Sequence, residues 1–135
     1  MLLPEWVAPA RTDGLWNATC FELFLRPGEG AGYFEFNFSP STQWAAYSFD
    51  AYRQGRRELP LSVAPHIEFE DDEARYVLEA DVDLSALPNT DLRMGISAVI
   101  EEQDGRKSYW ALAHPPGKPD FHHPDCFVLE LPAAV

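Results

Sequence analysis

Twelve prolines and eight glycines interrupt the chain at short intervals. Many of the stretches between them alternate apolar and polar residues with a period of two, which is the pattern of strands and not of helices. The clearest example is YFEFNF at residues 33–38, which places three phenylalanines on one face and Tyr33, Glu35 and Asn37 on the other. The sequence therefore predicts a mainly β protein with little room for helix.

Eight segments fit a strand pattern, and each is bounded by turn residues. They span residues 19–26, 33–38, 43–53, 66–70, 76–82, 94–103, 108–114 and 126–131. The glycines at positions 28, 30 and 32 join strand to strand and open no helix, so we expect a hairpin turn there and not a phosphate loop. Residues 83–88 are the only helical turn that we expect. This regular spacing predicts one antiparallel β-sandwich domain over residues 1–135.

The charge of the chain limits the classes of partner. With 22 acidic and 10 basic residues, the net charge is −12, which repels phosphate backbones and anionic lipid surfaces. Nucleic acid and membrane partners are therefore not expected. The acidic run at residues 68–73 predicts a solvated hairpin end, with a calcium site as the alternative.

Targeting signals and cysteines bear on the compartment. Residues 1–9 lack the basic start and long apolar run of a signal peptide, so we expect a cytoplasmic protein. Cys20 and Cys126 would suit one disulfide in an oxidising compartment, but without an export signal we expect free, buried thiols.

A first group of candidate ligand-binding residues comes from the strands before residue 50. The alternation predicts that Trp44 shares one non-core sheet surface with three polar residues, which are Glu22, Glu35 and Asn37. Aromatic faces stack on sugar rings, while carboxylates and amides bond to hydroxyls. The alternative is that a loop covers these residues and they only satisfy backbone groups. Trp16 could rim the same pocket or cap the end of the sandwich.

A second group lies in the proline-rich stretch at residues 109–126, which holds three of the four histidines. The candidate ligand-binding residues there are Trp110, His114, Lys118, Asp120, His122 and His123. A metal site and a hydrogen-bonded structural loop are the alternatives, but no HExxH or facial-triad spacing is present. We therefore predict no catalytic residue, no metal ligand and no cofactor.

Two motifs resemble a known family. DGLWNATCFELFL and GYFEFNFSPSTQWAAYSFD resemble the DOMON-like superfamily, close to family-nine carbohydrate-binding modules, and SYWALAHPPGKPDFHHPDCF looks like its bacterial cytoplasmic branch. Together they cover most of residues 11–131. The resemblance implies a β-sandwich that binds sugars or haem in characterised relatives. Haem-binding relatives use a Met and His axial pair; Met94 lies in a predicted strand, and no matching histidine is identifiable by motif.

The chain departs from this family at its start, because relatives begin with further N-terminal strands. We therefore expect a sandwich that lacks N-terminal strands and exposes a strand edge, which favours self-association or a protein partner. The leading hypothesis is a non-catalytic module that binds a carbohydrate or related small molecule. The alternatives are a protein-interaction module that pairs through an exposed edge, and a haem- or metal-binding domain.

Overall fold

The computed structural model describes residues 1–28 and 30–135, and nearly all of their regular structure is β-strand. The strands are β1 (Cys20–Pro27), β2 (Tyr33–Phe38), β3 (Trp44–Phe49), β4 (Arg57–Glu58), β5 (His66–Asp71), β6 (Tyr76–Asp81), β7 (Leu92–Glu101), β8 (Lys107–Ala111) and β9 (Leu129–Leu131). Two single-turn 3-10 helices, η1 (Leu15–Asn17) and η2 (Pro124–Cys126), complete the described elements. The predicted all-β class is confirmed. The expected helical turn at residues 83–88 is a non-helical turn, and β4 was not predicted.

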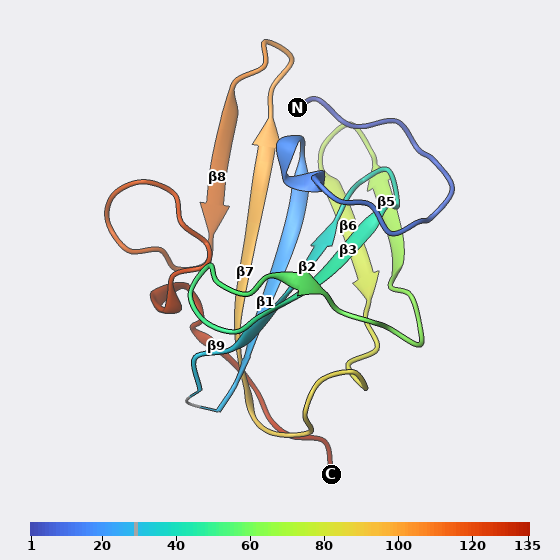
Figure 1. The fold of residues 1–135 in the computed structure, drawn as a ribbon. Coiled ribbons are helices and arrows are strands. Elements are labelled where there is room, and N and C mark those ends of the chain that lie inside the picture. The colour runs from blue at the N-terminus through green and yellow to red at the C-terminus, as the bar shows by residue number, and fades with distance from the viewer. Residues whose placement is uncertain (29) are drawn as a thin grey trace.

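Seven strands form the main sheet, which is antiparallel throughout. Its order is β4-β3-β2-β1-β7-β8, and β9 pairs with the first part of β7, beyond the stretch that β8 occupies (Figure 1). The turn between β1 and β2 contains residue 29, which lies outside the described residues. The two strands flanking that turn pair as a hairpin, as the glycines there predict.

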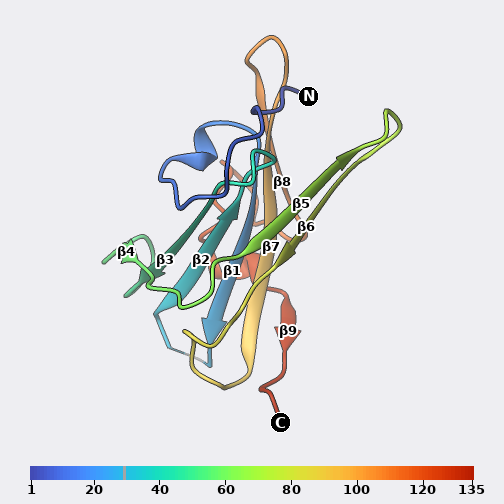
Figure 2. The same ribbon diagram turned by 90° about the vertical axis from the view of Figure 1, so that its right-hand side faces the viewer.

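A second layer covers part of this sheet. It is the β5–β6 hairpin, which crosses the main sheet at an angle and projects its tip beyond it (Figure 2). The hairpin packs Ile67 against a core in which Leu25 and Phe36 are fully buried. The acidic run ends at the exposed tip, where Asp71 and Asp72 accept hydrogen bonds from turn amides, so the predicted solvated hairpin end is confirmed.

The opposite face of the main sheet is also covered, by η1 and by the loop that leads into η2. There Phe24 and Tyr33 pack against Phe121 and Phe127. All six residues of β3 are buried, because the strand contacts a core on each side. Alternation predicts one core face for each strand, and this prediction is wrong for β3: in a strand buried on both faces, alternation no longer separates inside from outside.

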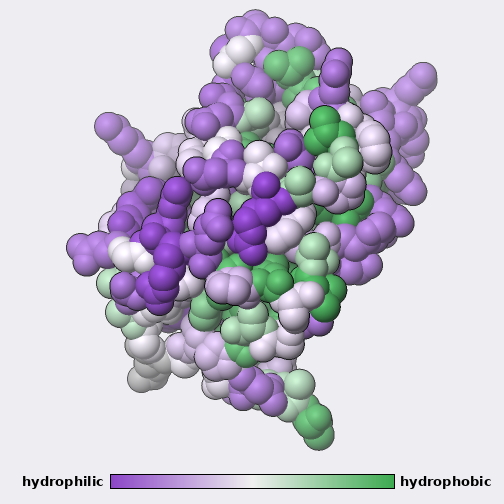
Figure 3. Space-filling model, turned by 45° about the vertical axis from the view of Figure 1, so that its right-hand side comes forward, coloured by the Kyte–Doolittle hydropathy of each residue, from purple (hydrophilic) through white to green (hydrophobic). Residues whose placement is uncertain are grey.

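Hydrophilic residues dominate the surface seen in Figure 3, and hydrophobic residues gather mainly in its lower middle. Cys20 and Cys126 are free and buried, as predicted. Among the described residues, no helix has the length and apolar character that a membrane crossing requires.

Candidate functional site

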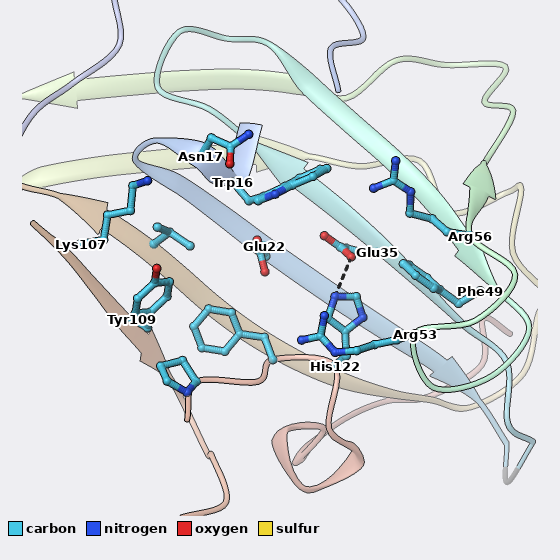
Figure 4. Close-up of a pocket in the computed structure, with 13 residues that line it drawn as sticks. Trp16, Asn17, Glu22, Glu35, Phe49, Arg53, Arg56, Lys107, Tyr109 and His122 are labelled. Atoms are coloured by element: carbon cyan, nitrogen blue, oxygen red, sulfur yellow. Dashed lines mark ion pairs between the residues drawn. The ribbon is translucent and has the colours of Figure 1, made fainter. Parts of the chain in front are cut away.

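A pocket of about 450 Å³ opens on the face opposite the β5–β6 hairpin. Its floor comes from β1, β2 and β7, and its walls come from η1, β8, the loop after β3 and the loop before η2. Figure 4 shows two floor carboxyls, Glu22 and Glu35, with Trp16 on one side of them and His122 on the other. The pocket thus joins strands from the sheet centre to loops far apart in sequence.

The two floor carboxyls are neighbours because of strand register. Glu22 lies opposite Asn37, and Phe24 lies opposite Glu35, which makes the two glutamates diagonal neighbours on one face. Glu22 is 7% exposed and Glu35 is 5% exposed. The hydroxyl of Ser97 donates to Glu22 Oε2 over 3.4 Å.

Burial governs how this pair titrates. Loss of hydration raises the pKa of both glutamates, and the charge of Glu22 raises the pKa of Glu35 further. Smaller opposing effects come first from Ser97 on Glu22 and from Asn37 on Glu35, and then from the arginines at the rim of the pocket. The pair therefore holds a proton at pH values where exposed glutamates have lost theirs. A pair that retains a proton presents both a hydrogen-bond donor and acceptors to the pocket.

A chain of hydrogen bonds fixes His122 beside the pair. The backbone N–H of Arg53 donates to Tyr33 Oη over 3.0 Å, and Tyr33 Oη forms a 2.8 Å hydrogen bond with His122 Nδ1, in which we assign the hydroxyl as the donor. Because Nδ1 is then the acceptor, the ring proton is assigned to Nε2, which lies 3.4 Å from Glu35 Oε1. Burial, assisted by the charge of Arg53, lowers the pKa of His122 to about 4. The imidazole is therefore a neutral donor to the floor.

Three basic side chains line the pocket, although the chain as a whole is acidic. These are Arg53, Arg56 and Lys107, and all three are exposed. Arg53 has a left-handed backbone (φ 53°), and its Nη2 lies 2.7 Å from Asp120 Oδ1. The Arg56 guanidinium lies 4.7 Å from the ring centroid of Tyr47. The rim therefore presents N–H donors above a floor of carboxyls.

Aromatic side chains form the walls. Trp16 belongs to η1, which begins after Gly14, a glycine with a left-handed φ of 78°. The Trp16 ring meets Tyr47 edge to face at 6.2 Å between centroids. On the other side, Tyr109 is half exposed and Phe121 is buried beside it. An apolar wall on each side of a polar floor suits a ligand with both C–H and O–H surfaces.

The structure brings together four of the predicted site residues: Trp16, Glu22, Glu35 and His122 all line the pocket. Asn37 lies on the same face but is fully buried, and among the described residues neither polar atom of its amide has a hydrogen-bond partner, although the amide is close enough to Glu35 to lower the pKa of that carboxyl. It therefore lies beside the floor and does not line the open pocket.

Two predicted tryptophans lie on the other face of the sheet. Trp44 pairs with Phe38 and Tyr47 pairs with Glu35, so Trp44 faces the β5–β6 hairpin and not the glutamates. The predicted shared surface is therefore wrong for Trp44, which is buried under the Arg11 guanidinium at 4.5 Å. Trp110 pairs with Ala98 and is also turned away from the pocket, with 64% of its surface exposed.

Three of the remaining predicted residues, His114, Asp120 and His123, make hydrogen bonds that hold the proline-rich loop. His114 Nε2 accepts the backbone N–H of Asp120 over 2.6 Å, and His123 Nδ1 accepts that of Asp125 over 3.1 Å. The carboxylate of Asp120 accepts from Arg53 and Tyr52. Lys118 is exposed and outside the pocket. Across residues 1–28 and 30–135, no group of three or more His, Cys, Asp or Glu side chains is arranged to hold a metal ion.

Sequence reasoning missed several residues of the pocket. Alternation predicts only that Tyr109 and Trp110 face opposite sides of the sheet, and the pairing of Tyr109 with Val99 places Tyr109 on the face of Glu22. The basic residues Arg53 and Arg56 lie in the irregular segment after β3, where no periodicity indicates direction. Only the folded chain brings them to the glutamates.

Comparison with protein-family models, with curated proteins and with solved structures gives no match to this chain. The chemistry of the pocket is therefore the basis for a functional assignment.

Proposed function

We propose that this β-sandwich domain is a non-catalytic module that binds a small, neutral, hydroxyl-rich ligand, a carbohydrate or a close chemical relative, in the pocket above Glu22 and Glu35. One observation carries the proposal: two buried carboxyls open into a pocket whose walls are aromatic. Burying two carboxyls destabilises a fold unless charged groups compensate, and the groups that contact these two, Ser97 and the neutral His122, carry no charge. Such a pair is typical of binding sites.

The polar groups of the floor match hydroxyl groups. A ligand hydroxyl both donates and accepts, and the glutamate pair offers acceptors together with a retained proton. His122 Nε2–H adds a neutral donor, and the rim arginines add further N–H donors. An uncharged ligand can therefore hydrogen-bond to the floor carboxyls without placing a second charge beside them.

The walls and the size of the pocket favour the same class of ligand. Trp16 and Tyr109 provide apolar surface for the C–H face of a sugar ring. The volume of about 450 Å³ falls within the range of about 300–1,000 Å³ that is usual for small-molecule sites.

Tryptophan fluorescence tests this proposal. We expect a panel of neutral mono- and disaccharides to include at least one sugar that changes the emission of the chain with a saturable dependence on concentration. Trp16→Phe should remove most of this response, while Trp6→Phe, at an exposed position outside the pocket, should keep it. No saturable change with any sugar, by fluorescence and by calorimetry, would contradict the proposal.

The floor is tested by a matched pair of substitutions. Glu35→Gln keeps the shape of the side chain but replaces one acceptor oxygen with an NH2 donor, so we expect affinity for the identified sugar to fall about tenfold. Glu68→Gln, at an exposed position on β5, should leave the affinity unchanged. Equal affinities for the two variants would show that the carboxyl pair does not contact the ligand.

Two further expectations belong to this proposal. The similarity to DOMON-like and family-nine carbohydrate-binding modules rests on the motifs at residues 13–25 and 32–50, and an all-β sandwich is compatible with it. A cytoplasmic location is supported by the two free, buried thiols. Fractionation of cells that express the full-length protein tests the location.

A further inference from the structure

The outer strand β8 exposes an unusual amount of apolar surface. Within the described residues β8 pairs with β7 alone, so its other edge is open. Around this edge Trp110 is 64% exposed, Leu112 is 60% exposed and Ile96 is 45% exposed. Large hydrophobic residues beside an open strand edge mark a surface that pairs with another chain.

These three side chains share one face of the sheet. Trp110 pairs with Ala98, and the backbone N–H of Leu112 donates to the carbonyl of Ile96, so the alternation places Trp110, Leu112 and Ile96 together. This is the face that carries the β5–β6 hairpin, but the core beneath the hairpin does not include these residues. The second layer therefore leaves this end of the main sheet uncovered.

Charge distinguishes β8 from every other strand with an open edge. The other such strands all carry acidic residues: Glu58 in β4; Glu68, Glu70 and Asp71 in β5; Glu79 and Asp81 in β6; and Glu130 in β9. In β8, KSYWA, the only charge is that of Lys107. For a chain of net charge −12, β8 is thus the edge on which two copies can meet without placing carboxylates opposite each other.

The backbone of β8 is suitably oriented for such pairing. Because the N–H of Leu112 bonds to β7, antiparallel alternation directs the N–H groups of Lys107, Tyr109 and Ala111 outward. A two-fold axis at Tyr109 places each Lys107 opposite Ala111 of the second copy, so the two lysines stay apart. Each outward N–H then meets an outward carbonyl.

We propose that β8 pairs antiparallel with β8 of a second copy of this chain, about a two-fold axis at Tyr109, to form one continuous sheet across a homodimer. The exposed side chains Trp110, Leu112 and Ile96 lie along this junction, where the second copy shields them from water. The dimer does not depend on whether the pocket binds a sugar.

Sedimentation velocity of the full chain over a hundredfold range of concentration tests this proposal. We expect a dimer that dissociates on dilution. Trp110→Glu should weaken the dimer at least tenfold, and Trp6→Glu, which alters a residue of similar exposure outside the strands, should leave it intact. A monomer at all concentrations would overturn the proposal, as would equal weakening by the two variants.

Cysteine cross-linking tests the register and does not rely on a destabilising substitution. Directly paired residues have Cα atoms about 5.5 Å apart, which a disulfide can bridge, so Tyr109→Cys should form a disulfide-linked dimer under mild oxidation. In Ala111→Cys the two new cysteines are about 13 Å apart, so no rapid cross-link is expected. The natural cysteines are buried and do not compete. Equal cross-linking of the two variants would overturn the register about Tyr109.

Discussion

The two faces of the main sheet are both buried, yet they are built from different kinds of residue. The face under the β5–β6 hairpin is apolar, with Leu25, Phe36 and Ala46 fully buried. The opposite face buries Glu22 and Glu35 among aromatic side chains and keeps a pocket open above them. One face stabilises the fold by apolar burial, and the other gives up part of that stability to hold polar groups in place.

The largest expected effect is on the hairpin face. Phe36→Ala removes a fully buried ring from the core of the two layers, so we expect the free energy of unfolding to fall by about 3–5 kcal/mol. Urea unfolding followed by circular dichroism measures it. A loss below about 1 kcal/mol would mean that the hairpin face does not dominate the stability, and the contrast between the faces would fail.

The buried glutamates of the pocket face should make the free energy of unfolding depend on pH. Because folding raises the pKa of Glu22 and Glu35, the fold is most stable below the ordinary glutamate pKa, where both are protonated, and it loses stability as the pH rises through the raised values. Between about pH 5 and about pH 9 we expect this loss to be on the order of 2 kcal/mol, and the double variant Glu22→Gln/Glu35→Gln should largely remove it.

Urea unfolding of both proteins at the two pH values makes this measurement. Glu68→Gln/Glu70→Gln on the exposed β5 strand is the control, and it should keep the pH dependence of the natural sequence. If the floor variant and the control have the same pH dependence, the buried pair does not titrate as described.

The smallest expected effect concerns the hydrogen bonds that hold His122. Tyr33→Phe removes the hydroxyl between the Arg53 amide and His122 Nδ1, so we expect a loss of about 1–2 kcal/mol in unfolding free energy. Tyr76→Phe, at a half-exposed position on β6, should change it by less than about 0.5 kcal/mol. Similar losses in the two variants would show that the Tyr33 hydroxyl does not organise the pocket face.

The sequence predicts the strands well because each depends on local alternation and on the turn residues beside it. For β2, the boundaries at Tyr33 and Phe38 agree with the structure, and the glutamates of β1 and β2 share a face as expected. Sheet order and two-sided burial depend on long-range pairing, which alternation does not encode. Alternation predicts the wrong face for Trp44 for this reason, since only the register with Phe38 determines its direction.

The candidate site is predictable to a lesser degree. Alternation predicts that Glu22 and Glu35 share a face of the sheet. Arg53 lies in an irregular segment, and its left-handed backbone conformation directs its side chain to the pocket. Of the three histidines in the proline-rich loop, only His122 lines the pocket, and nothing in the spacing of the three distinguishes it.

Arg53 connects two otherwise separate loops across the pocket mouth. Its backbone amide donates to Tyr33, whose hydroxyl bonds to His122. Its guanidinium donates to Asp120 in the proline-rich loop. A pocket ligand that accepts a hydrogen bond from the Arg53 guanidinium would compete with Asp120 for that guanidinium. Loss of the Arg53–Asp120 ion pair would remove one of the contacts that fix the proline-rich loop, so we expect ligand binding to raise the mobility of this loop.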